Sequence, residues 1–419
     1  MKTSWLYSVP ICLYFFSLPF FIPLIEMFSW LSFLFAVGLY IKEAWQTKKC
    51  PSLKIGPDAS VWAFWVAMIL GALFTEGLQF SEKTYIIGEG RWVLLLYSTV
   101  FLLSQVSWNQ ERMVKVFGSL LLLVALTALG QTFTGVNPFT DIKMIEVQSG
   151  GVSFFRAPGM YDNTMTYSYS IAQWFCFLFA ILVTSPIKNQ GLRTFVWVVS
   201  GVLGISLLLT FTRGVWVSLF GALVVMAFLA KKKLAYTIIA VTLVVVPTLI
   251  ATVPAFHTKI VGAVDKSNLD RVKLWRANWL MFTENPVLGV GHRRNEKVVK
   301  EYYEKLDITD GIVGHAHNTY LQILSGMGLA GFIAYIGMSL SFLLVAWRLW
   351  LSSKHDVGWV RTIAIGAIGA QISLHLGGLT ESNFIDGEVN HTFIFGVAMV
   401  LALAKTPLKQ KTWGSDHIG

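Results

Sequence analysis

The sequence predicts an all-α membrane protein with about twelve transmembrane helices, because its composition and its long apolar stretches leave room for little else. Of its 419 residues, 55% are hydrophobic and only 13% are charged, whereas soluble domains carry about 25% charged residues. A helix that crosses a bilayer needs about 20 largely apolar residues. We therefore interpret residues 1–419 as a single integral membrane domain.

The predicted spans are apolar runs separated by short polar or basic segments. They lie at residues 6–24, 26–42, 60–76, 91–107, 112–131, 167–185, 193–211, 213–230, 233–251, 325–350, 360–379 and 390–405. The stretch between Arg193 and Lys231 would reach about 55 Å as one helix. We divide it into two spans at Thr212-Arg213, which places Arg213 at the boundary between membrane and water.

The segment from Asn318 to Trp350 is also too long for one span, at roughly 50 Å. Gly326, Gly328 and Gly331 offer a break within it. We predict a short, partly embedded helix over residues 318–324, followed by a full span. Irregular backbone at membrane depth is tolerated where it lines a cavity.

The distribution of charge predicts the orientation in the membrane. Lysines and arginines concentrate in alternate loops, and the loops between them lean acidic, as at Glu381, Asp386 and Glu388. By the positive-inside rule, the basic loops and both termini are cytoplasmic, and the long loop 252–316 between spans 9 and 10 lies outside. The net charge of +10 follows this orientation, so it indicates no nucleic-acid partner.

The long outer loop is predicted to be mostly helical. An amphipathic helix runs from Arg271 to Phe282 and ends at Asn285-Pro286, and a second short helix covers residues 296–306. The loop carries six lysines and four arginines against four aspartates and four glutamates. Long loops are translocated regardless of charge, so topology does not explain these arginines.

Arg213 and Arg271 are the first candidates for binding an anionic, lipid-carried substrate. One arginine side chain can bind two phosphate oxygens at once, and it does not lose its proton in proteins. Charged residues at membrane depth are costly and usually functional. The alternatives are an interfacial anchor for Arg213 and, for Arg271, a pair with the adjacent Asp270 or a solvated face.

Three further arginines of the outer loop have a weaker case. Arg293 and Arg294 follow the turn at residues 289–291, where a ligand clamp or a structural role would both fit. Arg276 lies about one and a half turns beyond Arg271 on the same predicted helix, so it is expected to face solvent.

His315 and His317 precede Asn318, which is placed to cap the following helix. A neutral imidazole there can take a proton from a sugar hydroxyl, and His317 is the candidate general base. The alternative for both is a capping or core histidine. A His-x-His pair binds zinc only with a third ligand, and none stands nearby. With no nucleotide-binding loop either, we expect no metal and no cofactor.

These motifs resemble the lipopolysaccharide O-antigen ligase family, within the wider O-antigen ligase/polymerase superfamily. The matching segments are Thr212-Arg213-Gly214; Arg271 and Trp275 with Asn285-Pro286-Val287-Leu288-Gly289-Val290-Gly291; and His315-Ala316-His317-Asn318-Thr319-Tyr320-Leu321-Gln322 with Gly326 and Gly328. Their order, together with the twelve-span layout, covers most of the chain. Ser325 departs from the family, which usually has an acidic residue near this position.

The resemblance implies transfer of a polysaccharide from undecaprenyl diphosphate to a sugar hydroxyl of lipid A–core, on the periplasmic side of the bacterial inner membrane. No metal or nucleotide is implied. Arg213 and Arg271 would hold the diphosphate, and His317 would deprotonate the acceptor, with inversion at the anomeric carbon. The further candidates for substrate binding are His315, Arg276, Arg293, Arg294 and Arg156. The implied partners are the lipid-linked donor, the lipid A–core acceptor and membrane lipids.

Other functions fit the same residues. An O-antigen polymerase or a protein O-oligosaccharyltransferase would use the same donor and catalytic groups with another acceptor. A transporter would use Arg213 and Arg271 to bind an anion that it translocates. The catalytic residues alone do not separate a ligase from a polymerase, and the sequence does not indicate an oligomeric state.

Overall fold

The computed structural model describes all residues except 1–3, 150, 254–256, 258–265, 354–357 and 406–419. Helices dominate the described residues. The first half of the chain forms α1 (Ser4–Ser17), α2 (Ile22–Thr47), α3 (Asp58–Phe74), α4 (Phe80–Gly88), α5 (Arg91–Gln105), α6 (Gln110–Thr134), β1 (Glu146–Ser149), β2 (Val152–Phe155), α7 (Thr164–Thr184) and α8 (Gln190–Leu209). The second half forms α9 (Arg213–Ala230), α10 (Lys232–Thr252), α12 (Lys266–Glu284), α13 (Asn295–Glu304), α14 (Thr319–Ser352), α15 (Trp359–Gly377), the short 3₁₀ helix η1 (Asn383–Ile385) and α16 (Gly387–Lys405).

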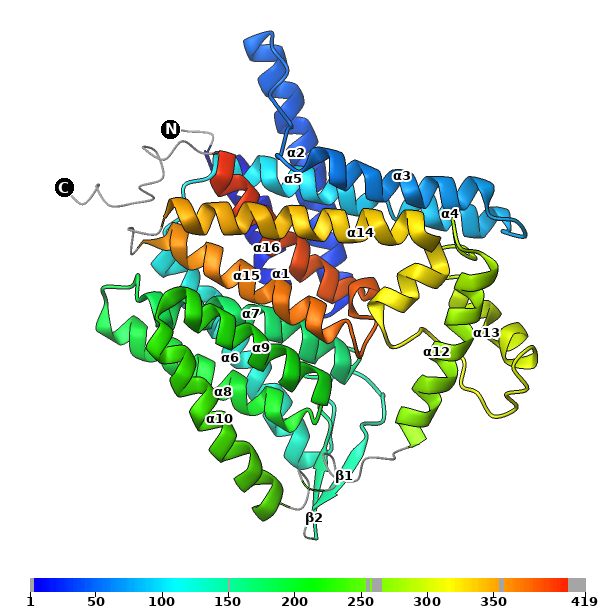
Figure 1. Cartoon of the computed structure of the whole chain (residues 1–419). Helices are drawn as coiled ribbons and strands as arrows, with labels where there is room; N and C mark the ends of the chain where they lie inside the picture. The colour runs from blue at the N-terminus through cyan, green and yellow to red at the C-terminus, as the bar shows by residue number, and fades with distance from the viewer. Residues whose placement is uncertain (1–3, 150, 254–256, 258–265, 354–357, 406–419) are drawn as a thin grey trace, which may run out of the picture.

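The long helices form one bundle. Helices α3, α14, α16, α15, α7 and α9 run side by side, and α12 and α13 lie together at one end of the bundle (Figure 1). Helix α15 packs closely on α7 and α9, where Gly366 faces Phe177 and Gly369 faces Met226, and a Cβ on either glycine would overlap that side chain. Because lipid is as apolar as these side chains, close packing through small residues stabilises such a bundle.

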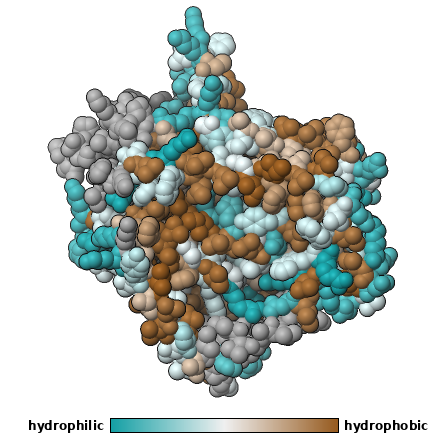
Figure 2. Space-filling model, in the orientation of Figure 1, coloured by the Kyte–Doolittle hydropathy of each residue, from teal (hydrophilic) through white to brown (hydrophobic). Residues whose placement is uncertain are grey.

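Eight helical segments among the described residues are long and apolar enough to cross a membrane. They are Ile22–Thr47, Phe80–Gln105, Gln110–Thr134, Thr164–Thr184, Gln190–Leu209, Arg213–Ala230, Thr319–Ser352 and Gly387–Lys405, and three shorter apolar helices are Trp5–Ser17, Asp58–Phe74 and Lys233–Leu249. In Figure 2, hydrophobic residues cover much of the visible face, and hydrophilic ones gather where α12 and α13 lie. The fold is a helical membrane protein with several spans, whereas the total of about twelve and the orientation stay predictions.

The hairpin of β1 and β2 was not predicted and departs from an all-α fold. Its strands pair antiparallel with Glu146 opposite Phe155 and Ser149 opposite Val152. Buried Val147 packs with Phe211 in the turn between α8 and α9. The hairpin therefore sets the position of Arg156, the residue that follows β2.

The predicted break near Thr212-Arg213 is confirmed. Helix α8 ends at Leu209, and Phe211 has a left-handed φ of 52°. A buried Thr212 then precedes α9, whose first residue is Arg213. Arg213 thus stands at the end of a helix, at one edge of the bundle.

The predicted break in the long segment after Asn318 is also present, but as a kink inside one helix. The Asn318 side chain accepts a hydrogen bond from the backbone N–H of Leu321, so Asn318 caps α14 as predicted. The helix continues through residues 318–324 to Gly328, where φ is 62° and ψ is −164°. Hydrogen bonds from Val290 N to Ser325 O (2.9 Å) and from Gly291 N to Gly326 O (2.9 Å) bind the preceding loop to this kink.

The loop that precedes α14 contains the two predicted helices. Helix α12 is longer than the predicted 271–282, and α13 begins one residue before the predicted 296–306. The side chains of Leu274 and Asn278 are buried on the inner face of α12. Asn278 Oδ1 accepts hydrogen bonds from Asn295 Nδ2 (2.8 Å) and Ser325 Oγ (2.7 Å), which joins α12 to α13 and α14.

Candidate functional site

The two histidines of the predicted site lie on the short segment between α13 and α14. Trp275 Nε1 donates to Ala316 O (2.9 Å), and Ala316 N donates to Gln322 Oε1 (2.7 Å), so α12 and α14 hold this segment from both sides. His317 has a left-handed φ of 47°. Because Asn318 supplies the helix cap, the His317 side chain is not needed for capping.

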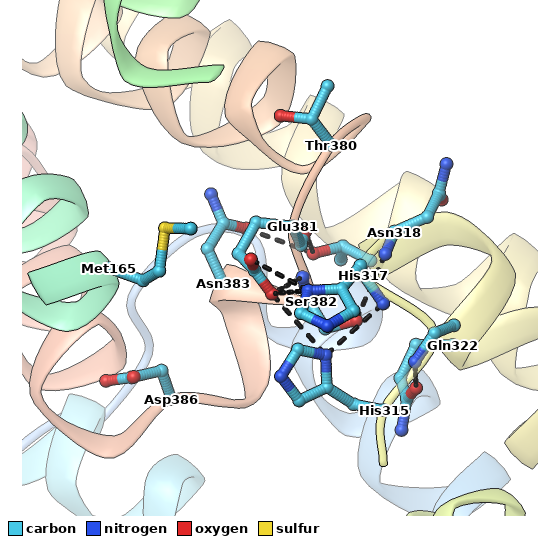
Figure 3. Close-up of polar contacts among 12 residues, drawn as sticks. Met165, His315, His317, Asn318, Gln322, Thr380, Glu381, Ser382, Asn383 and Asp386 are labelled. Carbon is cyan, nitrogen blue, oxygen red and sulfur yellow. Dashed lines mark hydrogen bonds and ion pairs between the residues drawn. The ribbon is translucent and has the colours of Figure 1, made fainter. Parts of the chain in front are cut away.

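Glu381 joins the two histidines, and it comes from the loop after α15 (Figure 3). The side chain is buried, with a residue exposure of 5%. Both of its oxygens lie 3.0 Å from His317 Nδ1, and Oε1 lies 3.4 Å from His315 Nδ1. Ser382 N also donates to Oε1 (3.0 Å). A single carboxylate thus contacts both predicted histidines.

Hydrogen bonds from the main chain and from two side chains fix the loop of Glu381 against the start of α14. Thr319 N donates to Gly378 O (2.7 Å), and Thr319 Oγ1 donates to Glu381 O (3.0 Å). Asn318 Nδ2 donates to Leu379 O (3.0 Å). The relative position of His317 and Glu381 therefore depends on these surrounding hydrogen bonds as well as on their own contact.

The electrostatics of this cluster favour an ionised carboxylate. Burial alone would raise the pKa of Glu381, but its hydrogen bond with His317 and the two nearby imidazoles hold the pKa below its usual value. Burial lowers the pKa of His315, partly opposed by the charge of Glu381. At neutral pH, Glu381 is therefore negative and His315 is neutral.

Arg271 reaches the same carboxylate from α12. Its Nη2 lies 3.9 Å from Glu381 Oε2, and its side chain is 20% exposed. Asp270 instead lies 3.8 Å from Lys273, so the alternative pair of Arg271 with Asp270 is not formed. The Nε of Arg271 is buried and has no hydrogen-bond partner among the described residues. A buried donor without a partner is rare and costly, which makes this nitrogen a candidate ligand contact.

Arg213 lies next to α12 as well. Its Nη2 donates to Asn268 Oδ1 (3.3 Å), and Asn268 stands one helical turn before Arg271. The adjacent Gly214 packs against Thr380, the neighbour of Glu381, so closely that a Cβ would overlap Thr380 Oγ1. The structure therefore brings Arg213, Arg271, His315 and His317 to one region of the molecule.

Arg156 supports the turn that precedes Arg213. Its Nε donates to Thr210 O (2.9 Å), and its Nη2 donates to Thr212 Oγ1 (3.3 Å). Thr164 Oγ1 donates to Arg156 O (2.7 Å), which links this residue to α7. Arg156 thus lies close to Arg213, and these contacts position the start of α9.

The remaining predicted arginines have other surroundings. Arg293 contacts Glu296 Oε1 (3.1 Å) and Tyr85 Oη (3.1 Å). Arg294 contacts Glu82 Oε2 (3.9 Å) and donates to Glu76 O (3.0 Å). Both therefore attach the outer loop to the α3–α4 segment, and these contacts lend no support to a clamp.

Arg276 is exposed on α12, as the sequence predicts for a solvent-facing position. No contact of Arg276 with the histidine cluster is present among the described residues. Its predicted share in substrate binding gains no support from its position.

The cluster of His315, His317 and Glu381 has the composition of a metal site. One ligand atom from each lies within 4.8 Å of the others, so the group could hold a metal ion. The third ligand that the sequence lacked locally is thus supplied by a distant loop. The Arg271 guanidinium next to the carboxylate disfavours a second cation there. The absence of a metal stays a prediction.

Glu381 was not predicted as a site residue. It lies 64 positions after His317, and nothing in its local sequence distinguishes it from other acidic residues of the outer loops. The only indication in the sequence was its position in an outer loop, between the predicted spans 360–379 and 390–405.

The fold and the site together define a helical membrane protein with cationic and imidazole groups gathered at one end of its bundle. Residues 198–336 match the family model described as O-Antigen ligase, and this match supports membership of the O-antigen ligase family. This family suggests a glycosyltransferase-like enzyme acting on polysaccharide or lipid-linked substrates. The match contains Arg213, Arg271 and His317 and ends before Glu381. No curated protein matches the chain.

Proposed function

We propose that this protein is an O-antigen ligase. It transfers a polysaccharide from undecaprenyl diphosphate to a sugar hydroxyl of lipid A–core, on the periplasmic side of the bacterial inner membrane. The observation that carries the proposal is the contact of Arg271 and His317 with one buried carboxylate. A cation for the leaving group and a base for the nucleophile thus stand close together.

The arginines act on the leaving group. As the bond between the anomeric carbon and the diphosphate oxygen breaks, negative charge develops on the diphosphate. Arg271 offers an Nε–H that no group of the described residues accepts, and Arg213 lies next to it through Asn268. Fixed donors aimed at developing charge stabilise a transition state by several kcal/mol. The diphosphate is weakly basic, so it leaves without a general acid.

His317 acts on the nucleophile. Its imidazole takes the proton of the acceptor hydroxyl while that oxygen forms a bond to the anomeric carbon. The diphosphate departs from the opposite face with the electron pair of the broken bond, so the configuration at carbon inverts. His317 then releases the proton to water. No metal takes part in this sequence of steps.

The test of this chemistry is a transfer assay with purified full-length protein, a lipid-linked donor and lipid A–core. We expect His317→Ala to lower the rate by about 10²- to 10⁴-fold, the usual contribution of a general base. His257→Ala is the matched control, because His257 is exposed and lies outside the cluster. Equal rates for the two variants would remove His317 from the base role.

The acceptor is tested in cells by deleting the gene and examining lipopolysaccharide. Loss of all polymer from lipid A–core identifies a ligase. A single attached repeat instead identifies a polymerase, and an unchanged lipopolysaccharide with loss of protein glycosylation identifies an oligosaccharyltransferase. Anion flux in proteoliposomes without a covalent product would replace the proposal with a transporter.

A further inference from the structure

The hydrogen bonds around Glu381 determine which nitrogen of each histidine carries a proton. An ionised carboxylate only accepts hydrogen bonds. Because both Glu381 oxygens lie 3.0 Å from His317 Nδ1, this nitrogen must carry the proton. In a neutral imidazole the other nitrogen is then an acceptor. A neutral His317 therefore has a free electron pair on Nε2, the form that a general base needs.

His315 has the opposite arrangement. Its Nδ1 accepts a hydrogen bond from the backbone N–H of His317 (3.2 Å). A backbone N–H cannot accept, so His315 Nδ1 must hold an electron pair and no proton. Its 3.4 Å approach to Glu381 Oε1 is then not a hydrogen bond. Since burial favours the neutral form of this ring, the single proton of His315 lies on Nε2, where it is a donor.

We propose that Glu381 is a positioning residue that fixes the Nδ1–H tautomer of His317, while the backbone N–H of His317 fixes the opposite tautomer of His315, so that His317 presents a basic Nε2 and His315 an Nε2–H donor. The base role of His317 rests on the proposed function, and the tautomers do not. The donor of His315 suits an oxygen acceptor of the substrate, either on the diphosphate or on the acceptor sugar. A proton acceptor and a proton donor would thus stand in neighbouring rings, whose centroids are 4.2 Å apart.

Arg271 makes this arrangement compatible with an anionic substrate. Its guanidinium lies 3.9 Å from Glu381 Oε2 and faces the same carboxylate as the two histidines. A bare carboxylate next to a diphosphate would repel it. The positive charge of Arg271 offsets that of the carboxylate. Glu381 can therefore orient His317 without leaving a net negative charge next to the substrate.

The tautomers are tested without any reaction. The full-length protein, labelled with ¹⁵N at histidine and placed in lipid nanodiscs, is studied by NMR at pH 7.5, and His315→Gln and His317→Gln assign the two rings. We expect a protonated Nδ1 for His317 and a protonated Nε2 for His315. Glu381→Gln should abolish the preference of His317, and Glu304→Gln, on an exposed acid of α13, should leave it unchanged. Equal tautomers in the two rings, or no response to Glu381→Gln, would overturn the proposal.

A bound metal gives a different pattern, because coordinating nitrogens carry no proton. If metal analysis of the purified protein finds one equivalent of zinc, and both Nδ1 signals show coordination, the tautomer proposal is wrong. Neither result depends on whether the protein is a ligase.

Kinetics provide the second readout. We expect Glu381→Gln to lower kcat by about 10²- to 10⁴-fold and to change its pH profile, while Glu381→Asp retains more activity because it keeps the charge.

His315→Gln, which keeps an N–H donor, should retain more activity than His315→Ala. A raised KM for the lipid-linked donor would assign the His315 contact to the diphosphate, and a raised KM for the acceptor would assign it to the sugar. Equal activity of His315→Gln and His315→Ala contradicts the donor role.

Discussion

The kink of α14 gives the most direct test of how the site is held in place. Gly328 has φ 62° and ψ −164°, a backbone region open almost only to glycine, and a side chain there costs on the order of 1–3 kcal/mol. A Cβ would also overlap the backbone of Val287. Gly328→Ala should therefore force apart the kink and the loop that follows α12.

The expected loss can be worked out from the contacts at the kink. Separation would remove the hydrogen bonds from Leu329 N to Pro286 O (2.8 Å) and from Ala330 N to Val287 O (3.2 Å). At about 0.5–1.5 kcal/mol each, the total with the backbone strain is about 2–6 kcal/mol. This is a large part of the roughly 5–15 kcal/mol that keeps a protein folded.

The assay is thermal unfolding of purified protein in detergent, with Gly337→Ala as the control. Gly337 lies on the same helix, and a Cβ there meets nothing within 4 Å. Alanine is the better helix former by about 1 kcal/mol, so Gly337→Ala should unfold at the same temperature or higher. We expect Gly328→Ala to unfold several degrees lower and to lose transfer activity. A Gly328→Ala protein as stable as Gly337→Ala would refute the reasoning.

Three further outcomes follow from the site. Arg271→Lys should lower the transfer rate about 10- to 100-fold, because lysine lacks the paired donors of a guanidinium. The control Arg193→Lys, at an exposed arginine of α8, should leave the rate unchanged. Equal transfer rates for the two variants would exclude a diphosphate clamp at Arg271. Burial lowers the pKa of His315 in the folded protein. As pH falls below about 6.5, this histidine is therefore protonated in the unfolded chain before it is protonated in the folded one. Native protein should therefore lose more thermal stability between pH 7 and pH 5 than His315→Gln, and an equal loss would contradict a buried neutral ring. Treatment with EDTA should leave transfer unchanged, and a loss restored by zinc would show that the cluster of His315, His317 and Glu381 works as a metal site.

Local patterns in the sequence predicted the elements that depend on neighbouring residues. The break at Thr212, the cap at Asn318 and the helix around Arg271 each follow from a short stretch of chain, and the structure contains all three. The sequence prediction placed the break in α14 among Gly326, Gly328 and Gly331, and the kink lies at Gly328. Its conformation at Gly328 depends on the loop of Val287, which no local pattern reveals.

The parts that the sequence did not predict depend on distant contacts. Glu381 acquires its role only because α15 returns it to His317. The partner of Arg293 is also distant in sequence, since Tyr85 lies 208 positions away, and no local pattern indicates this contact. The hairpin of β1 and β2 was missed because its four-residue strands are too short to show a clear alternation.

The main-chain bonds between the start of α14 and the loop after α15 limit how this protein can open. Sliding α14 along α15 by one turn would break the bonds of Thr319 to Gly378 and Glu381 and would draw the imidazole away from its carboxylate. Helix α12 is joined to this unit as well, by the Trp275–Ala316 bond, by the bond of Ser325 to Asn278 and by the 3.9 Å contact of Arg271. Admission of a bulky glycan chain would therefore have to leave both α12 and the loop after α15 attached to the start of α14.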